Sequence, residues 1–156
     1  MRTLNPEYVK TICNLTESSP YFQLLSMRIV HLEIGACELE IQIKAEKHMQ
    51  PFGVVHGGVF ASIIDAAAFW AVFPEIDEDK GMTSVDLKLN YLAPATSGVL
   101  RAQGTRIKVG QTLSLGEARV TDGQGKLLAH GSSTLITLPI SGFQADGRPM
   151  PKKFLG

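Results

Sequence analysis

The sequence has little of several features that mark common protein classes. Its two cysteines, Cys13 and Cys37, are too few for a disulfide framework, and no metal-ligand cluster accompanies either of them. Fifteen basic and fifteen acidic residues give a formal net charge of zero. This balance argues against nucleic-acid binding as the main role, although it leaves a local basic patch open. We therefore expect no metal ion and no nucleic-acid partner.

A long apolar run near the N-terminus is also missing. The opening residues, MRTLNPEYVK, do not resemble a signal peptide, so we expect a cytoplasmic protein without a membrane partner. Internal repeats and low-complexity segments are absent too. A chain of 156 residues can bury one sizeable core. We predict a single domain over residues 1–156, with an N-terminal helical segment at 1–20 and an irregular C-terminal arm at 139–156.

One strongly apolar stretch, GVVHGGVFASIIDAAAFWAVF at residues 53–73, dominates the rest of the sequence. From residue 59 onward its only polar residues are Ser62 and Asp65. A helix that is apolar on all sides is either a membrane span or the centre of a globular domain. A span needs roughly twenty apolar residues, and Pro74 cannot continue the helix. The stretch therefore predicts a central, buried helix that carries one carboxylate.

Three features of this helix allow both a functional and a structural interpretation. Gly57 and Gly58 present free N–H groups at the helix start, which suits either a cradle for a carbonyl oxygen or a tight turn. His56 either orients a ligand or closes the helix end. Asp65 is either a catalytic base or a structural carboxylate bonded to Ser62, because a buried charge needs a partner or a shifted pKa.

The remaining sequence predicts two strands before the central helix and four after it. The strands are expected at residues 27–34, 37–44, 81–93, 99–109, 112–121 and 126–138, and apolar and polar residues alternate at 37–44 and 81–93. In the third of these strands, strict alternation places Val85 and Leu87 on one face, and Ser84 and Asp86 on the other. Short helices are expected at 5–14 and 20–25, and a loop at 45–55. The fold class is α+β: a six-stranded antiparallel sheet curled around the helix, whose uncovered side suggests a second subunit.

Three phrases of the sequence are similar to a known family. GVVHGGVFASIIDAAA, SVDLKLNYLAPA and DGQGKLLAHGSSTL resemble the hotdog-fold acyl-CoA thioesterases of the 4-hydroxybenzoyl-CoA thioesterase superfamily. The HGG phrase, with an aspartate eight residues beyond its first glycine, looks most like the phenylacetic-acid-degradation-type branch. The resemblance runs from about Tyr21 to Leu138. It implies the hotdog fold and hydrolysis of a thioester to a free acid and coenzyme A, without a metal or other cofactor.

The resemblance also implies roles for five residues. The Gly57 N–H would polarise the thioester carbonyl as an oxyanion hole, and Asp65 would act as general base or as nucleophile. Ser84 matches a position that helps to place water, although a one-residue register slip would put Thr83 there. His56 matches a histidine that orients groups near the carbonyl. Gln50 stands where the family commonly has asparagine or a similar acceptor-donor side chain; glutamine carries the same amide on a longer stem, so it can keep the role, with a geometry that could alter rate or substrate choice.

Helix geometry adds an argument about how the site is assembled. Gly57 and Asp65 are eight residues apart, which is roughly 12 Å along a helix axis. A catalytic group must come within about 3 Å of the atom with which it reacts. We therefore predict sites shared between two antiparallel helices of a homodimer. Gly57, His56 and Gln50 come from one chain, and Asp65 and Ser84 come from the other.

Candidates for binding the rest of the substrate carry a weaker signal. Gly58 adjoins the predicted oxyanion hole. Four apolar side chains could line an acyl pocket, but equally could be core: Met49, Phe52, Phe60 and Phe69. Three residues near a predicted hairpin could bind the coenzyme A phosphates, but exposed cations are usually only solvated: Arg106, Lys108 and Gly110.

An enzyme is not the only function that this pattern allows. The alternative is a non-catalytic hotdog module that binds acyl-CoA, and a purely structural dimer is third. Asp65 favours the enzyme, because a binding module has no reason to bury a carboxylate beside a thioester. The acyl group stays open between aryl and fatty acyl chains. The resemblance also suggests that dimers pair into tetramers.

Overall fold

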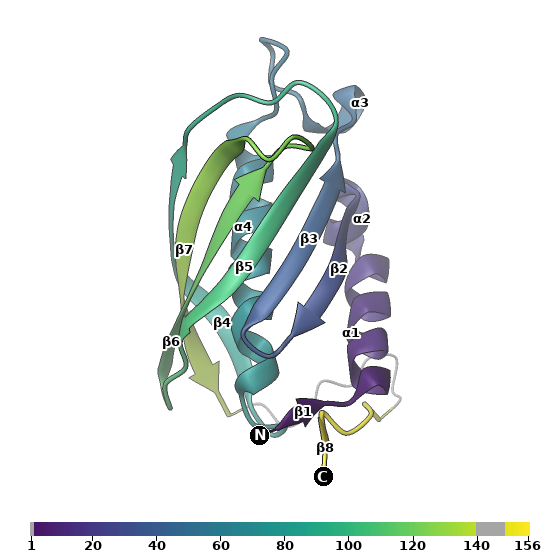
Figure 1. Ribbon diagram of the computed structural model, residues 1–156, viewed down its shortest axis with the longest axis vertical. Coiled ribbons are helices and arrows are strands. Elements are labelled where there is room, and N and C mark those ends of the chain that lie inside the picture. The colour runs from purple at the N-terminus through teal and green to yellow at the C-terminus, as the bar shows by residue number, and fades with distance from the viewer. Residues whose placement is uncertain (1, 140–148) are drawn as a thin grey trace.

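An antiparallel sheet of six strands forms the body of the protein in a computed structural model that describes residues 2–139 and 149–156 (Figure 1). The strands lie in the order β2-β3-β5-β6-β7-β4. Their bounds are β2 Met27–Glu33, β3 Ala36–Gln42, β4 Gly81–Tyr91, β5 Val99–Lys108, β6 Leu113–Thr121 and β7 Leu127–Leu138. The long helix α4, Gly57–Val72, runs across one face of the sheet. The predicted α+β hotdog fold is confirmed.

Two N-terminal helices, α1 (Pro6–Ser18) and α2 (Pro20–Leu25), stand beside the β2 edge of the sheet (Figure 1). Each begins with proline, whose fixed φ suits the first helical position. α1 is longer than predicted from the apolar pattern. Its buried face continues through Thr16, whose hydroxyl donates to the Ile12 carbonyl and so needs no partner outside the helix.

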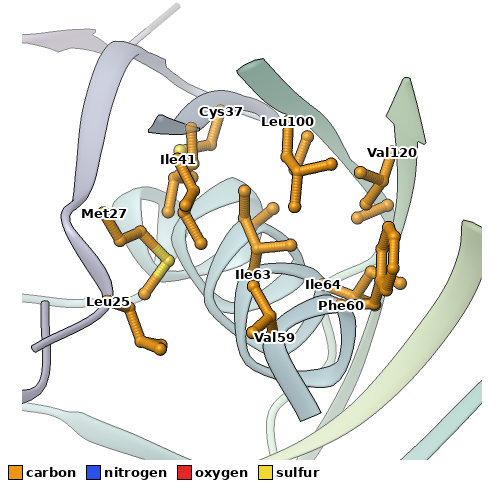
Figure 2. Close-up of a cluster of buried hydrophobic side chains, with 14 of the residues drawn as sticks. Leu25, Met27, Cys37, Ile41, Val59, Phe60, Ile63, Ile64, Leu100 and Val120 are labelled. Carbon is orange, nitrogen blue, oxygen red and sulfur yellow. The ribbon is translucent and has the colours of Figure 1, made fainter. Parts of the chain in front are cut away.

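Among the described residues, those of the sheet bury one face of α4. Its buried residues recur in adjacent pairs, as Ile63-Ile64 and Ala67-Ala68 illustrate. Figure 2 shows Ile63 and Ile64 between the helix and the sheet residues Leu100 and Val120. The opposite face is partly exposed and comprises Ala61, Ser62, Asp65, Ala66, Phe69 and Trp70. We call these six residues the uncovered face.

Glycines in the sheet let α4 approach it closely. A Cβ atom at Gly104 would lie 2.1 Å from the carbonyl oxygen of Ala67, and one at Gly116 would lie 2.6 Å from that of Ala68. Real Cβ atoms do not come this near to backbone oxygens. The helix backbone therefore rests directly on the strands, and alanines on α4 complete this close packing.

A β-bulge in β4 corrects the predicted alternation. Ser84 pairs with Leu135, but Asp86 pairs with Thr134, so Val85 is an extra residue that has no pairing partner on β7. The bulge shifts the side-chain period by one. As a result Ser84 faces α4, as Leu87 does, whereas strict alternation would have put these two side chains on opposite faces.

Two further segments differ from the prediction. The expected loop at 45–55 begins with a short helix, α3, Ala45–His48. α4 is followed by the 3-10 helix η1, Phe73–Glu75, so Pro74 tightens the last turn after ending the α-helix. The sequence predicts an irregular C-terminal arm from residue 139. Residues 140–148 lie outside the described part, and within residues 149–156 the regular structure is the two-residue strand Phe154–Leu155.

The end of the chain packs against the C-terminal end of α4. β8 (Phe154–Leu155) pairs with β1 (Thr3–Leu4). The side chain of Lys153 is buried, and its Nζ donates to the carbonyls of Phe73 and Ile76 at 2.7 Å each. Both carbonyls lie just beyond the C-terminal end of α4, and the Phe73 carbonyl also accepts a hydrogen bond from the Ile76 N–H. Burial lowers the pKa of Lys153 from 10.5 to about 8.

The segment Gly57–Glu75 is long and apolar enough to cross a membrane by length and composition alone. More than half of it is buried inside the protein, however, and its contacts are with the sheet. Core helices of globular domains pass the same test. The packing therefore accounts for the hydrophobicity of this segment.

Candidate active site

The N-terminus of α4 presents one free backbone donor. His56 is the N-cap residue, and its Nδ1 accepts a hydrogen bond from the Gly58 N–H at 2.8 Å. The Val59 N–H donates to the His56 carbonyl. Within the described residues, the Gly57 N–H has no acceptor. His56 thus closes the helix end, and it leaves Gly57 rather than Gly58 as the donor available to a ligand.

Tyr91 covers one side of this donor. Its hydroxyl donates to the Gly57 carbonyl at 3.3 Å, and a Cβ atom at residue 57 would lie 3.0 Å from that hydroxyl. The ring also packs edge to face with Phe60, at 6.3 Å between centroids. A side chain at residue 57 would therefore require the half-exposed Tyr91 ring to shift by a few tenths of an ångström.

Asp65 lies on the uncovered face and is held by two strands. Ser84 of β4 donates to its Oδ1 at 2.7 Å, and Ser133 of β7 donates to the same atom at 3.2 Å. Ser62 is not its partner, because that hydroxyl donates to the Gly58 carbonyl and is bonded to the Tyr21 hydroxyl. The interpretation of Asp65 as a carboxylate bonded to Ser62 is thus wrong.

A groove of about 400 Å³ lies along the uncovered face next to Asp65. Its walls are largely apolar and include Phe69, Trp70 and Leu87. Among the four predicted acyl-pocket side chains, Phe69 alone lines this groove. Phe60 is buried in the core, Met49 packs against the core, and Phe52 is 90% exposed at a loop tip.

Hydrogen bonds of the buried His48 hold the loop before α4 in place. His48 is buried, its Nδ1 accepts from the Lys44 N–H, and its Nε2 bonds the Leu25 carbonyl. Burial lowers the pKa of His48, which keeps the ring neutral with its proton on Nε2. The His48 carbonyl in turn accepts from the His56 N–H at 2.8 Å. This buried histidine therefore positions the start of α4.

Gln50 forms hydrogen bonds within the same loop. Its Oε1 accepts from the Phe52 N–H, and its backbone N–H donates to the Val54 carbonyl. The side-chain oxygen is thus engaged in a turn, and the amide NH₂ group is the part that remains for a ligand. A direct contact between Gln50 and Gly57 or Asp65 is absent from the described residues.

The three predicted phosphate-binding residues lie at the other end of α4 in the same chain. The Nε of Arg106 is 3.0 Å from Glu75 of η1, which neutralises it. The Gly110 N–H donates to Ser114, and Lys108 is exposed at the end of β5. α4 is roughly 24 Å long, so these residues are remote from Gly57 of their own chain. Their role stays a prediction.

The sequence analysis overlooked Ser133, Tyr91 and His48. Ser133 could have been found by continuing the period-two pattern of its strand. Ala129, Gly131, Ser133 and Leu135 alternate onto one face of β7, and among these Ser133 is the polar residue. His48 and Tyr91 act through contacts with distant segments, which leave no local signal. Within the described residues, no group of three or more His, Cys, Asp and Glu side chains could hold a metal ion.

Comparisons with known proteins show the family of the chain. Residues 52–129 match the model of the thioesterase superfamily. A Caenorhabditis elegans protein, provisionally named an esterase, is 35% identical over 82% of this chain and 77% of its own length. Acyl-coenzyme A thioesterase 13 of Mus musculus is 31% identical over 63% of this chain and 69% of its own.

A solved structure extends the similarity to the fold. The crystal structure of a thioesterase from Haemophilus influenzae has a TM-score of 0.80 and 22% identity, and the match covers 93% of this chain and all of that one. Residues 52–129, which match the family model, include the start of α4 and Asp65. The chain belongs to the thioesterase superfamily, and it is a thioester hydrolase.

Proposed function

We propose that the protein hydrolyses an acyl- or aryl-CoA thioester to the free acid and coenzyme A. The observation that carries this proposal is the position of Asp65. Its carboxylate is anchored through one oxygen by hydroxyls from two strands, yet it lies beside an apolar groove on the uncovered face. The family and the name of the mouse relative support a coenzyme A ester as substrate.

The chemistry divides between two parts of the helix. The Gly57 N–H donates to the thioester oxygen, at the positive end of the helix dipole. Asp65 takes a proton from water while the water oxygen bonds to the carbonyl carbon. The resulting tetrahedral oxyanion collapses, the C–S bond breaks, and the coenzyme A sulfur leaves with the proton that Asp65 returns. His56 fixes the helix end, and Ser84 fixes Asp65.

Asp65 could instead attack the carbonyl carbon itself and form an anhydride that water then hydrolyses. A single turnover in ¹⁸O-labelled water distinguishes the two routes. With Asp65 as general base, the first acid formed contains the label. With Asp65 as nucleophile and water attacking the aspartyl carbonyl of the anhydride, the first acid takes its new oxygen from the unlabelled carboxylate, so an unlabelled first acid identifies this route.

We further propose that each site combines Gly57, His56 and Gln50 of one chain with Asp65 and Ser84 of a second. One α4 carries both Gly57 and Asp65, at a separation of roughly 12 Å along its axis. The partly exposed face of α4, with its apolar Phe69 and Trp70, supports a second copy of the helix in antiparallel orientation. The position of Asp65 relative to Gly57 also supports membership of the phenylacetic-acid-degradation-type branch, and such dimers would pair into tetramers.

The test is release of free thiol from a panel of acyl- and aryl-CoA esters by wild type and by Asp65→Ala. We expect wild-type turnover of at least one ester class, and loss of turnover in the variant while the ester still binds. If no ester is hydrolysed and both proteins bind esters equally tightly, the protein is a binding module and the proposal fails.

A further inference from the structure

We propose that Ser133 is a positioning residue which, with Ser84, holds the Oδ1 atom of Asp65 and so makes Oδ2 the atom that reacts. This inference rests on the proposed thioesterase function. It assigns a role to a buried residue of β7 that contacts Asp65 from the sheet.

The hydrogen bonds to Asp65 are one-sided. Both hydroxyls donate to Oδ1, Ser84 at 2.7 Å and Ser133 at 3.2 Å. Within the described part of the chain, Oδ2 accepts no hydrogen bond. A carboxylate offers about four acceptor sites on its two oxygens. Two donors on one oxygen oppose rotation of the carboxylate, and they leave Oδ2 without a donor among the described residues on a side chain that lines the groove.

Ser133 is suited to hold the Asp65 carboxylate, which gains and loses a proton during the proposed reaction. Its side chain is fully buried, and its hydroxyl lies 3.2 Å from Asp65 Oδ1 and 3.1 Å from the Asp86 carbonyl. One hydroxyl has one proton, so it donates fully to one of these acceptors at a time. The ionised carboxylate is the stronger acceptor. When Asp65 holds the proton of the attacking water, the hydroxyl can turn to the Asp86 carbonyl and remain satisfied.

The β-bulge at Val85 makes this second acceptor available. Asp86 resumes the pairing with β7 after the extra residue, and its carbonyl lies within reach of the Ser133 hydroxyl. The same bulge turns Ser84 toward α4. A single backbone irregularity therefore places the Ser84 hydroxyl and the alternative acceptor beside the carboxylate that Ser133 also contacts. A serine needed only for packing would be satisfied by the Asp86 carbonyl alone.

The experiment compares steady-state kinetics of Ser133→Ala, Ser133→Cys and Ser132→Ala, with thermal unfolding of each variant. Ser132 is the matched control, because it undergoes the same change on the opposite face of β7 and forms no hydrogen bond through its side chain within the described residues. We expect Ser133→Ala to lower kcat roughly tenfold, as loss of one hydrogen bond to a charged group predicts, with KM changed less than twofold. Ser132→Ala should match wild type.

Ser133→Cys separates positioning from packing. The thiol fills the space of the hydroxyl but is a weak donor, so kcat should stay as low as in Ser133→Ala. Recovery of wild-type kcat in Ser133→Cys would show that only the cavity mattered, and would overturn the inference. So would a kcat for Ser133→Ala equal to that of Ser132→Ala.

Failure of the inference is distinct from failure of the proposed function. If wild type turns over esters and Asp65→Ala does not, while Ser133→Ala is unaffected, the inference alone fails. If wild type hydrolyses no ester, both fail. A double variant, Ser84→Ala with Ser133→Ala, should lose less than the product of the single losses, because both hydroxyls act on one oxygen. Losses that multiply would contradict their joint action through Oδ1.

Discussion

Complementation between two inactive variants tests the shared site most directly. Gly57→Pro removes the proposed oxyanion donor with little change in backbone geometry. Proline is favoured at the first position of a helix, and His56 before it is already extended, with φ −63° and ψ 139°, as a residue before proline should be. Gly57→Ala is the control, because it adds the same Cβ contact with Tyr91 but keeps the N–H.

The magnitudes follow from the arrangement of the helices. Loss of one oxyanion donor costs about 10²–10³ in kcat, so Gly57→Pro should be nearly inactive, and Asp65→Asn should be inactive as well. In a mixed dimer, one site takes Gly57 from the Asp65→Asn chain and Asp65 from the Gly57→Pro chain, so it is intact. The other site carries both defects. With random exchange about half of the dimers are mixed, so an equimolar mixture should regain about a quarter of wild-type activity.

The assay is thiol release after the two variants are unfolded together, refolded and shown to form mixed dimers by differential tagging. Each variant refolded alone provides the baseline. If verified mixed dimers stay at that baseline, Gly57 and Asp65 act within one chain, and the distance argument is refuted. If Gly57→Ala is as inactive as Gly57→Pro, crowding of Tyr91 rather than the missing donor explains the loss.

Three further predictions concern stability and the site. Because the pKa of Lys153 is about 8 when folded and 10.5 when unfolded, the unfolded chain alone keeps the proton between these values. Between these two pKa values the free energy of unfolding should therefore rise with pH by up to about 3 kcal/mol. Urea unfolding of Lys153→Met should lack this rise. Gly104→Ala should lower the free energy of unfolding by about 3 kcal/mol, because its Cβ meets a helix carbonyl, whereas Gly123→Ala, in open space, should not. Ser84→Ala should lower kcat roughly tenfold, and Thr83→Ala should not; the opposite result would indicate the slipped register.

Local patterns were sufficient for most of the fold. Each strand alternates over its own residues, and α4 is apolar over its own length, so these elements could be predicted without knowledge of their neighbours. The β-bulge at Val85 could not be predicted in this way, because a bulge depends on how β4 pairs with β7. The packed C-terminal segment depends on Lys153 reaching the end of α4, about eighty residues earlier in the chain, and no periodicity signals such a contact.

The site was predictable in part for the same reason. Gly57 and Asp65 lie in one continuous motif, and helix geometry alone gives their separation. The partners of Asp65 come from two other strands, so the nearest hydroxyl in sequence, that of Ser62, was a misleading candidate. The hydrogen bond from Gly58 to His56 is local but depends on the histidine rotamer. That one contact distinguishes the Gly58 N–H, which is bonded to His56, from the Gly57 N–H, which is available to a ligand.

The residues on the uncovered face support an antiparallel pair of helices in a further way. If Gly57 of one chain lies opposite Asp65 of the next, the two-fold axis passes the residue midway between them, which is Ala61. Gly57, Ala61 and Asp65 are spaced by four, so they share one side of α4. A crossing at alanine lets two backbones approach more closely than a crossing at Phe69 or Trp70 would. The small side chain thus stands at the point where this geometry requires the closest contact, and the bulky aromatics lie where the helices have room to diverge.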